Sequence, residues 1–138
     1  MNGVVPSVNR LTFRKPERLV SRKIIEQLVE KGKSFQIAPF RLIWMVHNLQ
    51  VANPVQVAFT APKRNFKSAV ERNKIKRLMK EVYRKNKAGL YSFVKDKHVQ
   101  VALLIVYTGK VIPKYSEVEV KLTLTLQRFV EDFQKHSV

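Results

Sequence analysis

An α+β fold is predicted by the order in which hydrophobic patterns of three kinds follow one another along the chain. A short amphipathic stretch comes first, and three segments rich in β-branched and aromatic residues follow it. A long basic amphipathic stretch then leads into a continuous apolar run, and a last amphipathic stretch closes the chain. The order αβββαβα predicts a two-layer sandwich, with helices on a four-stranded mixed sheet and the long basic helix as a crossover.

The first helix is predicted over residues 21–31. Ser21 suits the N-cap, the apolar residues of the stretch share one face, and Gly32 is placed to end the helix. Pro16 suits the first turn of a preceding short helix, where its missing N–H costs nothing.

Three strands are predicted next, over residues 34–38, 40–47 and 55–60. Their short spacing predicts an antiparallel meander.

The central helix is predicted over residues 69–84. Its apolar residues fall at i, i+3, i+4 and i+7 and form one stripe, which contains Ile75, Leu78, Met79 and Val82. The pattern fades around residues 86–89, with room for a further turn at residues 90–94.

The run over residues 99–107 predicts a strand covered on both faces and parallel to an earlier strand. A closing helix is predicted over residues 115–134, with Ser116 and Glu119 as its capping box.

The composition indicates a single domain that binds a polyanion. The chain has 138 residues and a net charge of +17, an excess that favours nucleic acid or an anionic surface. Its apolar runs are too short to span a bilayer, it shows no signal-peptide pattern, and it has no cysteine. We therefore expect a cytoplasmic protein with a flexible arm over residues 1–10 and one RNA-binding domain over residues 11–138.

One face of the central helix gathers cations. Residues 63–87 hold eleven Lys or Arg against two Glu, and Glu71 and Glu81 fall outside the cationic face. The face consists of Arg72, Asn73, Lys76, Arg77, Lys80 and Arg84. Stacked like charges cost a helix stability, which a nucleic-acid backbone would restore. The alternative is a solvated basic face without a partner.

A second basic group lies near the first helix and comprises Arg14, Lys15, Arg18, Lys31, Lys33 and Arg41. Aromatic residues that could stack on unpaired bases are interleaved with it, namely Phe13, Phe35, Phe40 and Trp44. Most of these aromatics are expected in the core.

No constellation for catalysis or metal binding is found in the sequence. The three histidines are scattered, and the chain offers no metal motif, no glycine-rich phosphate loop and no paired nucleophile and base. We therefore expect no catalytic residue and no metal ligand in the protein.

The stretch over residues 57–84, VAFTAPKRNFKSAVERNKIKRLMKEVYR, resembles the signature of the bacterial ribonuclease P protein subunit. Residues 11–35 are similar to that family's opening helix, and residues 101–110 to its last strand. Two departures stand out: Lys74 replaces the motif's second arginine, and the loop before the helix is longer than usual and contains Phe66.

The resemblance implies a fold like domain 2 of ribosomal protein S5. It also implies a monomeric protein that joins a catalytic RNA and promotes magnesium-dependent removal of the 5′ leader from precursor tRNA, with Mg²⁺ held at the RNA. Carried onto this sequence, the contacts with RNA would be made by Lys63, Arg64, Lys67, Arg72, Asn73, Lys74, Lys76, Arg77, Lys80 and Arg84. The leader would lie between the first helix and the sheet, with Phe13, Arg14, Arg18 and Lys33 as candidates.

Two other functions remain open on the residues alone. A ribosomal protein or RNA chaperone could use the same helix on structured RNA. A DNA-binding module could place the helix in a major groove, although no dimerisation element or helix-turn-helix spacing is present.

Overall fold

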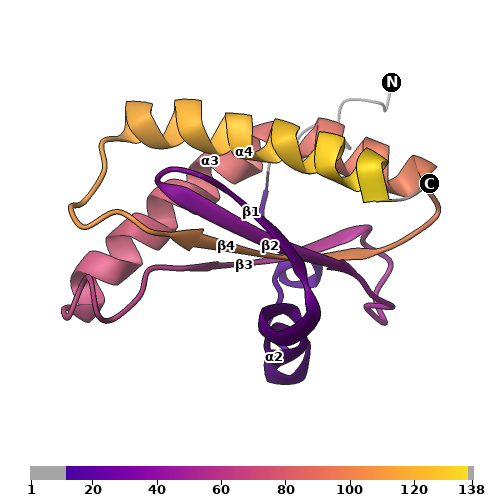
Figure 1. The fold of residues 1–138 in the computed structure, drawn as a ribbon, viewed down its shortest axis with the longest axis horizontal. Helices are drawn as coiled ribbons and strands as arrows, with labels where there is room; N and C mark the ends of the chain where they lie inside the picture. The colour runs from indigo at the N-terminus through magenta and orange to yellow at the C-terminus, as the bar shows by residue number, and fades with distance from the viewer. Residues whose placement is uncertain (1–11, 137–138) are drawn as a thin grey trace.

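The computed structural model describes residues 12–136, so the predicted arm over residues 1–10 lies outside the described part. The elements run in the predicted order αβββαβα, after a short 3₁₀ helix η1 that contains Pro16 (Figure 1). They are η1 (Lys15–Glu17), α2 (Arg22–Lys31), β1 (Lys33–Ile37), β2 (Phe40–Val46), β3 (Val55–Thr60), α3 (Ala69–Asp96), β4 (Val101–Tyr107) and α4 (Tyr115–His136). None of the helices within residues 12–136 is long and apolar enough to cross a membrane.

The four strands form one mixed sheet in the order β1-β2-β4-β3. β3 and β4 are parallel and α3 connects them, which confirms the predicted crossover. The predicted antiparallel meander is wrong in its second half, because β4 lies between β2 and β3 and pairs with both. The residues of β4 are apolar along its whole length, and all but Val106 are buried. The central position in the sheet suits this strand because it removes the most apolar surface from water.

Helices cover both faces of the sheet (Figure 1). α3 and α4 pack on one face, over side chains such as Leu42, Val57 and Leu103. α2 packs on the opposite face, where Leu28 meets Ile43 and Leu104 in a second, smaller core. Since α2 is only ten residues long, about 15 Å, it leaves part of that face uncovered.

α2 begins as the sequence predicts. The Ser21 side chain accepts a hydrogen bond from the backbone N–H of Ile24 at 3.3 Å, and Gly32 follows the last helical residue. A side chain at Gly32 would meet the Leu28 carbonyl oxygen at 2.5 Å, so this position favours glycine for its lack of a Cβ.

α3 is longer than predicted. It does not fade at residues 86–89 but continues to Asp96, because Leu90 and Val94 extend its buried stripe. Burying two such side chains outweighs the roughly 1 kcal/mol that Gly89 costs in a helix interior. The structure thus gives α3 a second half that lies beyond the basic motif.

The predicted capping box of α4 is wrong. The helix already includes Tyr115 and Ser116, and the acid that caps it is Glu117, whose carboxylate accepts from the backbone N–H of Lys114 at 3.3 Å. The helix therefore begins earlier than the predicted capping box requires, and sequence patterns do not fix the first residue of a helix to within one or two positions.

Candidate nucleic-acid interface

The loop before α3 is held in place by a buried aromatic side chain. Phe66 is buried and its ring packs against that of Tyr107, with centroids 6.1 Å apart. The backbone N–H of Phe66 also donates to the Pro62 carbonyl at 3.1 Å. The unusual aromatic in this loop is therefore an anchor to the core, and it leaves the neighbouring Lys63, Arg64 and Lys67 exposed.

Arg72 fastens the same loop to the start of α3. Its guanidinium Nη1 donates to the Phe66 carbonyl at 2.7 Å and to the Lys67 carbonyl at 2.9 Å. The Ser68 side chain caps the helix by accepting from the backbone N–H of Glu71 at 3.4 Å. Sequence analysis predicted that Arg72 contacts RNA. In the structure, Arg72 also positions the loop that carries three further cations.

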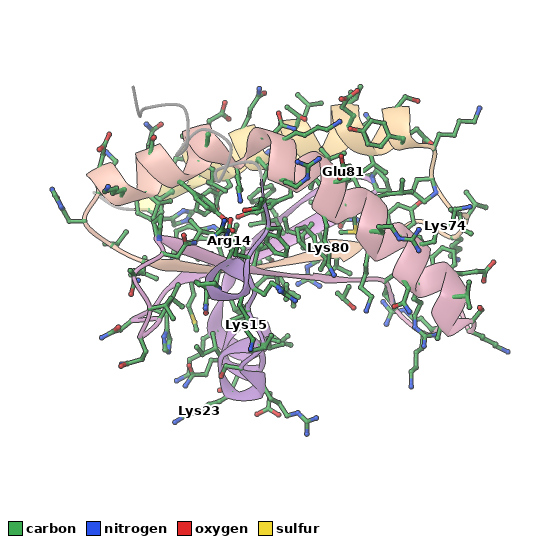
Figure 2. The ribbon with its side chains drawn as sticks, turned by 180° about the vertical axis from the view of Figure 1, so that it is seen from behind. Arg14, Lys15, Lys23, Lys74, Lys80 and Glu81 are labelled. Carbon is green, nitrogen blue, oxygen red and sulfur yellow. The ribbon has the colours of Figure 1, made fainter. Side chains whose placement is uncertain are left out.

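The remaining cations of the motif lie on the outer side of α3. Ile75, Met79 and Val82 are buried against the sheet, as the periodicity predicts. The other side presents Asn73, Lys74, Arg77 and Lys80 as exposed residues and Lys76 as a half-buried one. Figure 2 shows Lys74 and Lys80 along this helix.

These cations have no acidic partner among the residues that the structure describes. The name α3 basic surface is used below for Lys63, Arg64, Lys67, Asn73, Lys74, Lys76, Arg77 and Lys80. Cations held on one rigid helix and its anchored loop, without counter-charges, form a site to which phosphates can bind.

Arg84 is different from the rest of the predicted set. Its Nη2 lies 2.6 Å from a carboxylate oxygen of Glu81, and Lys85 approaches the same carboxylate at 3.6 Å. The hydrogen bond from Arg84 lowers the pKa of Glu81, and in turn raises that of Arg84. Glu81 lies outside the cationic face, as the sequence indicates, but its i,i+3 ion pair with Arg84 compensates the charge at the C-terminal end of that face.

The four leader candidates do not form one cluster. Arg18 sits beside β3, where it forms an isolated parallel bridge with Val57, whereas Lys33 begins β1 at the opposite edge of the sheet. The two residues flank opposite ends of α2. Arg14 lines a separate groove on the α3 side.

Phe13 is a packing residue. Its half-buried ring makes edge contacts with Phe59 and Tyr83, at centroid distances of 6.1 and 5.8 Å. The other aromatics of the second basic group are also engaged: Phe40 and Trp44 are buried, and Arg128 lies over the ring of Phe35 at 5.2 Å. The expectation that most of these aromatics belong to the core is confirmed.

A buried polar cluster was missed by sequence analysis. Lys87 forms an ion pair with Glu17, and both side chains are buried. The Tyr91 hydroxyl donates to the same carboxylate oxygen at 2.8 Å. The sequence does contain a sign of this cluster, because Lys87 falls on the buried stripe of α3. A buried lysine requires an acidic partner, which must come from elsewhere in the chain.

The fold and the α3 basic surface together define a small basic protein that binds a structured polyanion. Comparison with protein families gives a match to the Ribonuclease P family over residues 13–129. The chain therefore belongs to the ribonuclease P family, and its function is that of the protein subunit of this endoribonuclease in tRNA 5′ processing.

Two relatives agree with this assignment. The chain is 28% identical to the ribonuclease P protein component of Porphyromonas gingivalis, over 83% of each chain. It is 32% identical to that of Chlorobium phaeobacteroides, over 75% of this chain and 78% of the relative.

Solved structures share the fold. The ribonuclease P protein from Thermotoga maritima matches with a TM-score of 0.64 at 22% identity, over 81% of this chain and 96% of that one. The Staphylococcus aureus protein matches with a TM-score of 0.63 at 18% identity, over 83% and 96%.

Proposed function

We propose that the α3 basic surface binds a catalytic RNA subunit, and that the uncovered part of the sheet beside α2 holds the single-stranded 5′ leader of precursor tRNA. The observation that carries the first part is the row of Asn73, Arg77 and Lys80, which are exposed on a rigid helix with no acidic partner in residues 12–136. Binding there would release counterions from the RNA and would weaken steeply with salt.

The second part is supported by the sheet face that α2 leaves open. Thr60, Val106 and Arg41 lie side by side across β3, β4 and β2. Thr60 and Val106 are half-buried and Arg41 is exposed, so the strip combines a shallow apolar floor with a cation. Arg18 stands before the start of α2 and would contact a phosphate of the same strand. Lys33 lies directly opposite Trp44, whose side chain packs on α4, so the Lys33 side chain lies on the other face of the sheet.

The chemistry of cleavage is assigned to the RNA. Residues 12–136 contain no group of three or more His, Cys, Asp or Glu side chains that could hold a metal ion. Magnesium ions at the catalytic RNA supply the hydrolytic chemistry, and the protein contributes RNA affinity and screening of phosphate repulsion. We expect the protein to act as a monomer in the cytoplasm.

A reconstitution experiment tests this proposal. Labelled precursor tRNA is incubated with the protein alone, with the catalytic RNA alone, and with both, at a low magnesium concentration. We expect cleavage only where the catalytic RNA is present, with a gain from the protein that is larger for a substrate with a leader. Cleavage by protein pretreated with micrococcal nuclease, or no gain on adding the protein, would contradict the proposal.

A further inference from the structure

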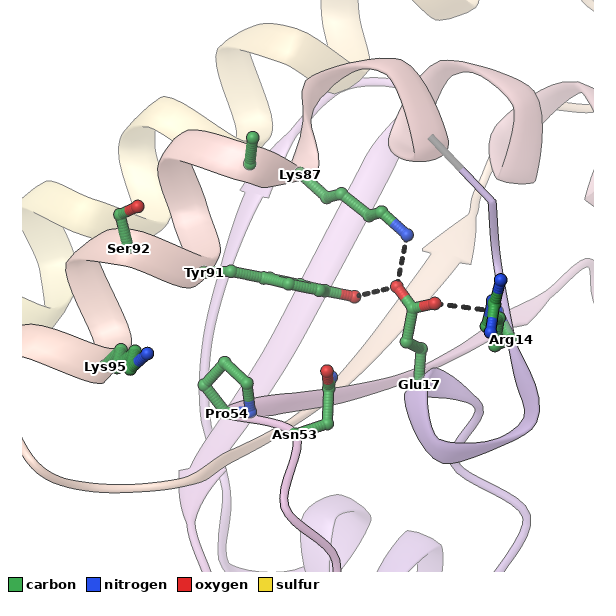
Figure 3. A pocket seen from close by; sticks show the side chains of 9 residues that line it. Arg14, Glu17, Asn53, Pro54, Lys87, Tyr91, Ser92 and Lys95 are labelled. Carbon is green, nitrogen blue, oxygen red and sulfur yellow. Dashed lines mark hydrogen bonds and ion pairs between the residues drawn. The ribbon is translucent and has the colours of Figure 1, made fainter. Parts of the chain in front are cut away.

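A groove outside the α3 basic surface lies between η1, the start of β3 and the second half of α3. It has a volume of about 580 Å³, and its lining includes Arg14, Glu17, Asn53, Tyr91 and Lys95 (Figure 3). It is distinct from the strip of Thr60, Val106 and Arg41 that is proposed to hold the leader, because that strip lies on the α2 face of the sheet whereas this groove borders α3. A groove of this size exceeds what a single phosphate needs and suits a small organic ligand.

The charge of the groove is positive despite the buried acid. Both carboxylate oxygens of Glu17 already accept hydrogen bonds within the protein. One is bonded to Lys87 and Tyr91, and the other accepts from the backbone N–H of Arg14 at 2.7 Å. Because Lys87 compensates the charge of Glu17, Arg14 and Lys95 determine the charge that a ligand meets. Figure 3 shows them at opposite ends of the groove.

The wall of the groove is an aromatic ring in a fixed orientation. The Tyr91 hydroxyl donates to Glu17 at 2.8 Å and accepts from the Tyr83 hydroxyl at 3.1 Å. Burial raises the pKa of Tyr91, so this hydroxyl stays neutral and can keep donating at physiological pH. Its ring is seen edge-on in Figure 3, with Pro54 and Asn53 below it. Lys87 Nζ lies over the other face of the ring, 5.6 Å from its centroid, so the face toward Pro54 and Asn53 is the one that borders the groove. A rigid, partly exposed ring is a platform on which a base can stack.

The groove also continues the α3 basic surface. Tyr91 follows Lys80 by eleven residues, which is about three helical turns or roughly 16 Å, so both lie on the same side of α3. Figure 2 shows Arg14 and Lys80 on the same side of the molecule. An RNA strand bound along α3 can therefore reach the groove without crossing the helix, by passing over Thr12 and Phe13, which contact Lys87 and Tyr83 between the two.

From these observations we propose that the groove binds a single-stranded ribonucleotide segment, with a base against Tyr91 and phosphates at Arg14 and Lys95. The Asn53 amide nitrogen donates to the Val55 carbonyl, so its amide oxygen is the atom left to accept a hydrogen bond from the edge of that base. The aromatic wall distinguishes this site from the α3 basic surface, which offers cations and one amide but no aromatic platform.

The test is an NMR titration of the full chain with a 5′-phosphorylated adenosine dinucleotide, with inorganic phosphate as a parallel arm. We expect the dinucleotide to shift the amide resonances of residues 53 and 87–95, and phosphate to shift them much less. Lys95→Ala should weaken dinucleotide binding about tenfold and flatten its salt dependence by about 0.7 log–log units.

Two further variants control for structure. Lys97→Ala removes the same charge two residues away, from an ammonium that lies over the Phe93 ring at 5.3 Å outside the groove, and should bind as the wild type does. Tyr91→Phe keeps the ring and should retain most of the affinity. Equal losses for Lys95→Ala and Lys97→Ala, or equal shifts with phosphate and dinucleotide, would overturn the proposal.

The bound segment could belong to the catalytic RNA or to the precursor tRNA, and two binding measurements on Lys95→Ala distinguish these sources. A weaker gel shift with the catalytic RNA assigns the segment to that RNA. An unchanged gel shift with weaker holoenzyme binding of precursor tRNA assigns it to the substrate. A loss in neither measurement contradicts the proposal, and leaves the proposed function of the α3 basic surface unaffected.

Discussion

The guanidinium of Arg72 donates a hydrogen bond to the main-chain carbonyl of Phe66 at 2.7 Å, and so ties the first turn of α3 to the loop before it. A residue of the RNA-binding motif thereby fixes the backbone next to a core anchor. The position of the loop cations relative to the helix cations depends on this contact.

We predict that Arg72→Lys weakens RNA binding although it conserves charge. A lysine cannot reproduce the planar fork that reaches both the Phe66 and Lys67 carbonyls. Amides of residues 65–67 should exchange hydrogen faster, and affinity for the catalytic RNA should fall by roughly tenfold. Arg77→Lys is the control and should leave loop exchange unchanged. Unaltered loop exchange in Arg72→Lys would show that the contact is dispensable.

The buried pair of Glu17 and Lys87 joins η1 to α3, so removing one partner should destabilise the fold. Glu17→Gln leaves a buried ammonium without its counter-charge, which should lower the free energy of unfolding by about 3–5 kcal/mol. The double variant Glu17→Gln with Lys87→Met should lose less. Urea denaturation measures both. An additive loss in the double variant would mean that the two side chains do not act as a pair.

Alkaline pH should unfold the protein through its buried tyrosines. Burial raises the pKa of Tyr83 and Tyr91 above the unfolded value of 10.0. Stability is therefore fully present below about pH 10 and falls above it, by up to about 1.4 kcal/mol per pH unit for each tyrosine. Phenolate absorbance of both groups should appear together with the loss of circular dichroism. Ionisation of either residue in the folded protein, identified with Tyr83→Phe and Tyr91→Phe, would contradict this.

Leader recognition should depend on the open sheet face beside α2. Arg18→Ala and Arg41→Ala should each weaken holoenzyme binding of precursor tRNA by about tenfold and leave mature tRNA binding nearly unchanged, whereas Lys33→Ala, on the α4 face, should weaken neither. Phe13→Ala is a poor probe, because its ring contacts Phe59 and Tyr83 and its loss should reduce stability. Affinities for substrates with and without a leader are the measurement. Equal losses for both substrates would remove the leader assignment.

The sequence predicted those parts of the structure that depend on local pattern. The caps at Ser21 and Gly32 and the buried stripe through Ile75 and Met79 follow from residue type and a period of 3.6. The second half of α3 was missed because Lys87 and Gly89 interrupt the pattern. Only the ion pair with a residue seventy positions away makes Lys87 acceptable there.

Contacts between distant residues could not be predicted from pattern. β2 pairs with β4 rather than with β3 because β4, which is apolar throughout, buries the most apolar surface when it lies at the centre of the sheet. Within the candidate site, sequence analysis found the cations but not their partners. The bonds of Arg72 to the loop and of Arg84 to Glu81 require side-chain geometry, and the separation of Arg18 from Lys33 requires the sheet order.

The most direct test of the central claim compares two charge reversals in a gel shift with the catalytic RNA. Arg77→Glu changes an exposed cation of the α3 basic surface, and Lys121→Glu makes the same change at an exposed position of α4. Circular dichroism should show both variants folded. We predict that Arg77→Glu weakens assembly by roughly tenfold or more, whereas Lys121→Glu assembles as the wild type does. Equal effects of the two reversals, or normal assembly by Arg77→Glu, would contradict the claim that this face of α3 binds the RNA.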